Sequence, residues 1–118
     1  MKKKEIIFPV EVVSKEPEEW RKKESATVFI TRKYSTLFFV SMVNKVLEKH
    51  GFCIIKAKNR SNIYKLMWLL TYFHFRIGKD VEVESFRLWI EPCKNLFLSE
   101  GSPLRSVLSA ELKLQKTS

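Results

Sequence analysis

Residues 52–60 read FCIIKAKNR, and this stretch decides the fold. Four apolar residues are followed by an alternation in which Lys56 and Lys58 flank an alanine, and Asn59 then breaks the pattern. A continuous apolar run of this length is typical of a strand that is covered on a face by other parts of the protein. We therefore expect a strand over 52–58 with basic side chains at its carboxyl end.

The region before this strand predicts a helix between Lys33 and Gly51, where apolar residues recur at helical spacing. Ser35 or Thr36 can cap its first turn, and Gly51 suits the left-handed residue that ends a helix. The expected apolar stripe consists of Leu37, Phe38, Val40, Met42, Val43 or Asn44, Val46 and Leu47.

The region after the strand predicts a second helix with two apolar stripes. It follows a polar turn over 59–62, with Ser61 or Asn62 as its cap, and extends to about Ile77. The first stripe comprises Ile63, Leu66, Leu70, Phe73 and Ile77, and the second comprises Tyr64, Trp68, Tyr72 and Phe75.

A helix that lies on a sheet needs one apolar stripe, so the second stripe indicates another packing partner. We expect that partner to be another copy of the chain; a helix strongly buried within a monomer is the alternative. The predicted dimer interface consists of Tyr64, Trp68, Tyr72, Phe75 and Ile77.

Further strands are predicted on both sides of these elements. Residues 26–32 are β-branched and aromatic, 81–91 alternate with a slip at Ser85 that a β-bulge would cause, and 104–116 alternate again. The last two would form a long β-hairpin. The expected fold is a two-layer α/β (α+β) sandwich of order β-α-β-α-β-β, with both helices on one face of a four-stranded mixed sheet.

The length of 118 residues suits one domain, which we place at 25–118. Residues 1–24 are expected to form an N-terminal arm with an edge strand, since Pro9 is tolerated at sheet edges. Two cysteines 40 positions apart exclude a disulfide framework. No apolar run is long enough for a membrane span or a secretory signal, so a soluble, cytoplasmic protein is expected.

The net charge is +9, from 22 Lys and Arg against 13 Asp and Glu. Most of it lies between Ser25 and Gly78, where nine basic residues face a single acid, Glu48. A basic balance of this size favours binding to polyanions such as nucleic acid. The alternative is a solvated lysine-rich surface, and the segregation of the charge into one segment favours a binding face.

This order of elements resembles the Alba family of nucleic-acid-binding proteins from about Ala26 to Lys116. The most specific match is IIKAKNR at 54–60, which looks like the family's VIKARGR. VEVESFRL at 81–88 is similar to VKVKEIKI, and VLSAELKLQK at 107–116 is similar to STIEIVLAK. The family's GKKP loop is replaced by Thr-Arg-Lys-Tyr, which lacks both the glycine and the proline.

The resemblance implies a homodimer or heterodimer that binds DNA and RNA. Arg32 and Lys33 stand where the family's lysine pair contacts phosphates, and the hairpin would reach toward the minor groove. The candidate nucleic-acid contacts are Arg32, Lys33, Lys56, Lys58, Asn59, Arg60, Arg76, Lys94 and Arg105.

We expect no enzymatic activity, because His50 and His74 lack neighbours at nucleophile or metal spacing and no glycine-rich phosphate loop is present. No catalytic residue, metal, cofactor or small-molecule substrate is predicted. The expected function is compaction of nucleoid DNA by a dimer that contacts phosphates without sequence specificity, as a chromatin protein does. The alternatives are an RNA-binding subunit of a ribonuclease P/MRP-like ribonucleoprotein and a heterodimerising modulator of a related Alba protein.

Overall fold

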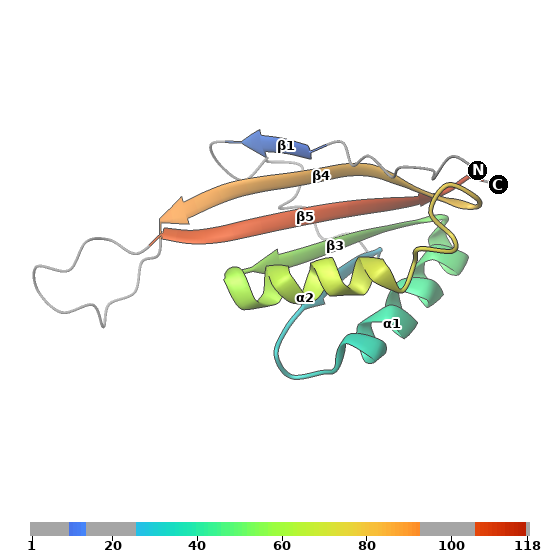
Figure 1. Cartoon of the computed structure of the whole chain (residues 1–118), viewed down its shortest axis with the longest axis horizontal. Coiled ribbons are helices and arrows are strands. Elements are labelled where there is room, and N and C mark those ends of the chain that lie inside the picture. Colours follow the sequence, from blue (N-terminus) through green and yellow to red (C-terminus); the bar gives the residue numbers. More distant parts are fainter. Residues whose placement is uncertain (1–9, 14–25, 93–105, 118) are drawn as a thin grey trace, which may run out of the picture.

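The structure is a computed structural model, and it describes residues 10–13, 26–92 and 106–117 (Figure 1). Its elements are β1 (Val10–Val13), β2 (Thr27–Ile30), α1 (Thr36–His50), β3 (Phe52–Lys58), α2 (Arg60–Thr71), β4 (Val81–Pro92) and β5 (Ser106–Lys116). The predicted order β-α-β-α-β-β and its mixed sheet are confirmed by β2 to β5. β1 adds a fifth strand at one edge.

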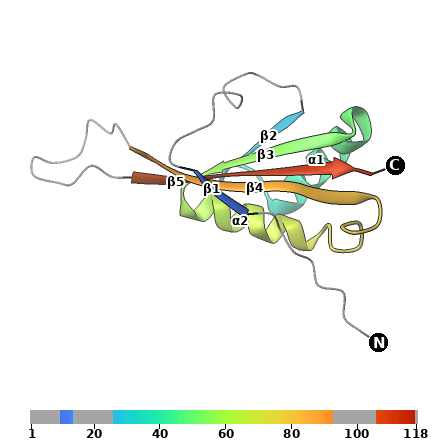
Figure 2. The same ribbon diagram turned by 90° about the horizontal axis from the view of Figure 1, so that it is seen from above.

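The sheet has the order β1-β4-β5-β3-β2, with both helices on one of its faces (Figures 1 and 2). β2 runs parallel to β3, and β5 runs antiparallel to both β3 and β4. β1 pairs in parallel with β4, so that Val13 lies opposite Trp89. The register of β4 against β5 shifts between Val83 and Ser85, which confirms the predicted bulge.

The parallel pair β2 and β3 sets the position of the candidate site. In register, Ile30 of β2 lies opposite Ala57 of β3, so the carboxyl ends of the two strands meet at the same edge of the sheet. The chain leaves each strand there through a short loop and enters a helix. We call this place the carboxyl edge and define it by residues 31–35 and 58–61.

The main core lies between the helices and the sheet. The buried helix residues are Phe39, Val43 and Leu47 in α1 and Ile63, Leu66 and Leu69 in α2. The sheet contributes Val28, Ile30, Ile55, Ala57, Leu112 and Leu114 to the same cluster. Because side chains alternate along a strand, the residues between these positions point to the other face of the sheet.

The expected apolar stripe of α1 is wrong in its first turn. Leu37 and Phe38 are 62% and 41% exposed, and Phe39 is buried in their place. Phe39, Val43 and Leu47 follow one another at a spacing of four residues, so they share one helix face. Leu37 and Phe38 therefore lie on the solvent-exposed side of α1.

The helix boundaries differ in part from the predicted ones. Ser35 caps α1, and Gly51 ends it with φ 80°, as predicted. The cap of α2 is Asn59, not Ser61 or Asn62, because the Asn59 side chain accepts from the backbone N–H of Asn62. α2 also ends early, at Thr71, and Leu69 takes the buried position expected for Leu70.

The face of the sheet opposite the helices also buries side chains. Trp89 is 2% exposed and lies beside Ser109 in the β4–β5 register. Ser109 and Glu111 are also buried, although both are polar. Trp89 is thus a buried residue on this face of the sheet, outside the main core cluster. Within the described ranges, no helix is long and apolar enough to span a membrane.

Candidate nucleic-acid interface

Five of the predicted nucleic-acid contacts meet at the carboxyl edge: Asn59 and four basic residues. Arg32 and Lys33 follow β2, Lys58 ends β3, and Arg60 opens α2, and all four side chains are exposed. The Arg32 Nη2 atom donates to the Ser61 hydroxyl at 3.3 Å, although the two residues are 29 positions apart in sequence. The parallel pairing of β2 and β3 brings these two basic loops together.

Both helices begin next to these loops, and neither has an acidic residue in its first turn. The unpaired N–H groups and the dipole at a helix N-terminus favour anions and disfavour cations. Arg60 nevertheless stands in the first turn of α2. This end of the protein therefore combines exposed positive charge with helix ends that a bound anion would stabilise.

Asn59 shapes the turn between β3 and α2. Its φ of 70° and ψ of 161° make it the one non-glycine residue with a positive φ in the described part of the chain. Its Oδ1 atom accepts from the Ser61 hydroxyl at 2.8 Å and from the Asn62 N–H at 3.2 Å. Asn62 in turn donates to the Lys58 carbonyl at 3.0 Å. These bonds hold the backbone that presents Lys58 and Arg60.

Lys65 holds the backbone of the other loop, which connects β2 to α1. From the second turn of α2, its ammonium donates to the Thr31 carbonyl at 2.9 Å and to the Tyr34 carbonyl. It also lies 5.3 Å from the centre of the Phe39 ring. Lys65 thus ties down both ends of the segment that carries Arg32 and Lys33. In the sequence Lys65 is only one of several basic residues, because the two carbonyls that it holds lie more than 30 positions away.

A cavity of about 360 Å³ opens beside the basic loops. Its lining includes Phe29, Lys56, Lys58, Asn59 and Asn62. Lys56 lies on the sheet face opposite the helices, with its ammonium 5.9 Å from the centre of the Phe29 ring. The cavity therefore brings predicted basic residues next to an exposed aromatic ring.

Three aromatic residues at this end were not among the predicted site residues. Phe29, Tyr34 and Phe38 are 61%, 42% and 41% exposed. The Tyr34 ring stacks on Phe38 with 4.3 Å between ring centres, and the Lys33 ammonium lies 5.5 Å from the Tyr34 ring. The segment FITRKY at 29–34, which places aromatic residues on both sides of the basic pair, is the sequence signal for Phe29 and Tyr34.

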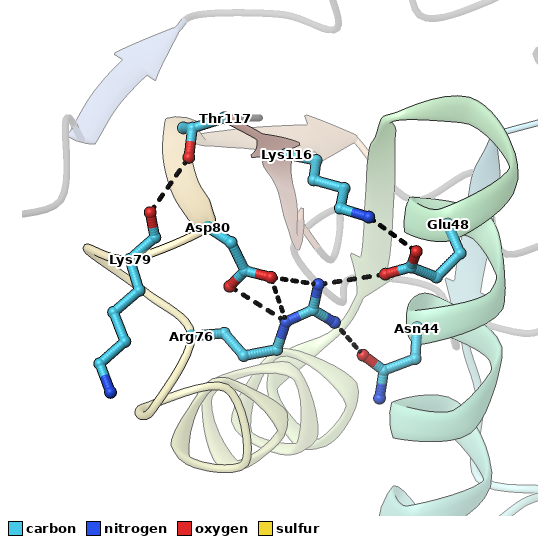
Figure 3. Close-up of polar contacts among 7 residues, drawn as sticks. All are labelled: Asn44, Glu48, Arg76, Lys79, Asp80, Lys116 and Thr117. Carbon is cyan, nitrogen blue, oxygen red and sulfur yellow. Dashed lines mark hydrogen bonds and ion pairs between the residues drawn. The ribbon is translucent and has the colours of Figure 1, made fainter.

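Arg76 is not brought to the carboxyl edge. It follows α2, whose 12 residues span about 18 Å, and it lies in the cluster of Figure 3. Its guanidinium donates to Asn44 at 2.6 Å, to Asp80 at 2.9 Å and to Glu48 at 3.3 Å. Lys116 donates to the same Glu48 carboxylate at 2.7 Å. Arg76 thus joins α1, the turn after α2 and, through Glu48, β5.

The carboxyl groups of this cluster are held in their charged form. The hydrogen bond from Arg76 lowers the pKa of Asp80 below its usual value. Hydrogen bonding and the charge of Lys116, followed by Arg76, lower the pKa of Glu48. We call Asn44, Glu48, Arg76, Asp80 and Lys116 the Arg76 cluster.

Four of the five predicted dimer residues form an exposed stripe on α2 and the turn after it. Tyr64, Trp68, Tyr72 and Phe75 are 61%, 51%, 50% and 79% exposed. We call these four, with the 55% exposed Met67, the aromatic stripe. Ile77 is not part of it, because it is half-buried and packs against the core.

Other predictions on single residues have separate outcomes. Lys94, Arg105 and Cys93 lie outside the described residues. Cys53 is buried, and burial raises the pKa of its thiol to about 12, so it stays protonated and unreactive at neutral pH. Across 10–13, 26–92 and 106–117, no group of three His, Cys, Asp or Glu residues could hold a metal ion.

No protein-family model matches the sequence, and no curated protein matches it either. The similarity to the Alba family therefore stays a prediction, and the function is inferred from the residues at the carboxyl edge.

Proposed function

We propose that this protein binds nucleic acid without catalysis, through phosphate contacts at the carboxyl edge. The observation that carries this proposal is the meeting of Arg32, Lys33, Lys58 and Arg60 beside two helix N-termini. Cations that contact phosphates release counterions, and this supplies affinity that does not depend on sequence.

The charge count gives the expected size of the salt effect. Each phosphate contact lowers the logarithm of the affinity by about 0.9 per tenfold rise in salt on duplex DNA. Four contacts per chain would thus weaken binding roughly 100-fold between about 50 and 200 mM salt. A steep dependence of this kind separates phosphate binding from binding driven by apolar surface.

We further propose that the protein acts as a dimer through the aromatic stripe. Soluble monomers rarely leave contiguous apolar patches of large side chains exposed, and aromatic residues and methionine are enriched at interfaces. A second copy would bring a second carboxyl edge and double the number of phosphate contacts. A heterodimer with a related chain, which this protein would modulate, is the alternative.

Two cellular roles are compatible with such a dimer. Compaction of nucleoid DNA is the role that the resemblance to chromatin proteins implies. The RNA-binding subunit of a ribonucleoprotein is the second candidate, and the exposed rings of Phe29 and Tyr34 beside the cations favour it, because RNA offers unpaired bases.

The test is an anisotropy titration of labelled duplex DNA, duplex RNA and single-stranded RNA at two salt concentrations. The double variant Arg32→Ala, Lys33→Ala should bind more weakly, with a salt slope smaller by about two. The matched control is Lys45→Ala, Lys49→Ala, which removes the same charge from exposed positions of α1 away from the carboxyl edge.

The control variant should bind nearly as the wild type does. Failure of the wild type to bind any ligand at low salt would refute the proposal. An equal loss in both double variants would show that net charge, and not the carboxyl edge, accounts for binding.

A further inference from the structure

Exposed aromatic rings occur on both sides of the basic loop. Phe29 precedes the loop on β2 and is 61% exposed; Tyr34 follows it and is 42% exposed. Each ring offers a large flat apolar surface on which another flat group can stack. Their position beside phosphate-binding cations gives them a candidate partner.

Phe29 lies on β2, the outermost strand of the sheet, and points to the face opposite the helices. It stands opposite Lys56 in the β2–β3 register, and the Lys56 ammonium is 5.9 Å from the ring centre. The ring also borders the cavity of about 360 Å³ next to Lys58. A flat group entering this cavity would meet the ring and a cation together.

Tyr34 forms a second platform on the other side of the loop. Its ring stacks on Phe38 with an angle of 24° between the ring planes, and the Lys33 ammonium lies 5.5 Å from it. Lys65 holds the Tyr34 carbonyl, so the backbone at this position is fixed. The platform is therefore in place before any ligand arrives.

The spacing of these groups suits a chain of nucleotides. Phe29 and Tyr34 are five positions apart, a reach of about 18 Å at most, and Arg32 and Lys33 lie between them. A strand that crosses the loop would meet a ring, then cations, then a second ring. In a duplex the base faces are hidden by stacking, so only an unpaired strand can use the rings.

We propose that the carboxyl edge binds single-stranded nucleic acid, with Phe29 and Tyr34 stacking on unpaired bases on either side of the phosphates held by Arg32 and Lys33. This inference rests on the proposed function and names its class of ligand. RNA and single-stranded DNA share the phosphates and base faces that are recognised, so the experiment includes both.

The test compares a labelled 12-nucleotide RNA, the DNA of the same sequence and the 12-base-pair duplex DNA, at one low salt concentration. The variant is Phe29→Leu, Tyr34→Leu, which keeps apolar side chains but removes the flat rings. The control is Phe52→Leu. Phe52 pairs with Lys113 at 5.2 Å in the same ring–cation arrangement, but about 20 Å along β3 from Lys58.

The wild type should bind the single strands at least about 5-fold more tightly than the duplex, the equivalent of one base–aromatic stack. The ring variant should lose this preference and bind the duplex as the wild type does. Phe52→Leu should keep the preference. A tighter complex with RNA than with single-stranded DNA would assign RNA as the ligand, and equal binding would assign both.

Duplex binding as tight as single-strand binding by the wild type would overturn the inference, as would a ring variant that keeps the preference. The proposed function would survive either result if Arg32→Ala, Lys33→Ala still weakened binding to the duplex. Circular dichroism melting of each variant shows that it is folded. A 2-aminopurine base in the DNA strand adds an independent signal, because its emission should change on binding to the wild type and not to the ring variant.

Discussion

Asn59 occupies a backbone conformation that glycine usually adopts. With φ 70° and ψ 161°, it costs about 1–3 kcal/mol for a residue that has a side chain. The hydrogen bonds of its side chain to Ser61 and Asn62 offset part of that cost. Glycine would relieve the strain, but it has no side chain that could cap α2. Asparagine therefore keeps the turn beside Lys58 and Arg60 rigid, although its own backbone is strained.

Lys65 leads to a prediction about the loop that carries Arg32 and Lys33. It concerns how firmly the loop is held and not how much charge it carries. Lys65→Met should lower nucleic-acid affinity by about 2- to 10-fold, the equivalent of one net hydrogen bond, because the Thr31 and Tyr34 carbonyls lose their donor. The salt slope should not change, since the ammonium of Lys65 faces the protein. Anisotropy titrations over a salt series measure both quantities.

Lys65→Arg, which keeps a donor, is the matched control and should recover part of the affinity. A salt slope that falls by about one in Lys65→Met would instead mean that Lys65 contacts a phosphate directly.

The two faces of α2 illustrate what a helical pattern predicts well. The division into a buried stripe and an aromatic stripe follows from the period of 3.6 residues, and the exposed fractions of Tyr64 and Trp68 agree with it. The first residue of α2 was predicted wrongly, because several polar residues in a row can serve as the cap. Only the backbone conformation of Asn59 decides among them.

The aromatic stripe leads to a prediction about assembly. Trp68→Gln should convert the proposed dimer to a monomer at micromolar concentration, because a central aromatic residue carries much of the energy of an interface. Sedimentation velocity measures the change in mass. Leu37→Gln is the control: it removes another exposed apolar side chain, but from α1 and outside the stripe.

A wild-type protein that sediments as a monomer would contradict the homodimer. Mixing it with a related chain and observing a new, heavier species would then support the heterodimer.

At the scale of the whole molecule, two groups of charged residues in the described part differ in their charge balance. The carboxyl edge gathers exposed cations, whereas the Arg76 cluster balances its cations with Glu48 and Asp80. The sequence segment with the excess of positive charge contains both Arg32 and Arg76, so composition could not separate them. Their different roles depend on contacts across elements: Arg76 meets Glu48 from 28 positions away.

The Arg76 cluster predicts how stability depends on pH. The pKa values of Glu48 and Asp80 are lowered in the folded protein from 4.5 and 3.8, so the unfolded chain takes up protons first as the pH falls. The free energy of unfolding should therefore be constant above about pH 5 and decrease below it. Urea denaturation at pH 7 and pH 3.5 measures this change.

Arg76→Gln should reduce the change between the two pH values, because it removes the main cause of the lowered pKa of Asp80. Lys33→Gln, which removes an equal charge at the carboxyl edge, should leave it as in the wild type. A pH dependence that Arg76→Gln does not alter would place its origin in other carboxyl groups.

Strand pairing shows where prediction from the sequence ends. The β4–β5 hairpin follows from local alternation, and the parallel pair β2 and β3 follows from the helix between them. The partner of β1 does not follow from any local pattern, because a strand of four residues could pair with either edge. In the structure it lies beside β4 and not beside β2.

The position of β5 has a consequence for synthesis on the ribosome. It is the last of the described strands in chain order, yet it joins the pair β2–β3 to the pair β1–β4. While the nascent chain emerges, β2, α1, β3 and α2 can assemble, but the hydrogen-bonding edge of β3 that β5 will occupy stays open. The carboxyl edge can therefore form early, whereas the complete sheet must wait for residues 106–116 to leave the exit tunnel.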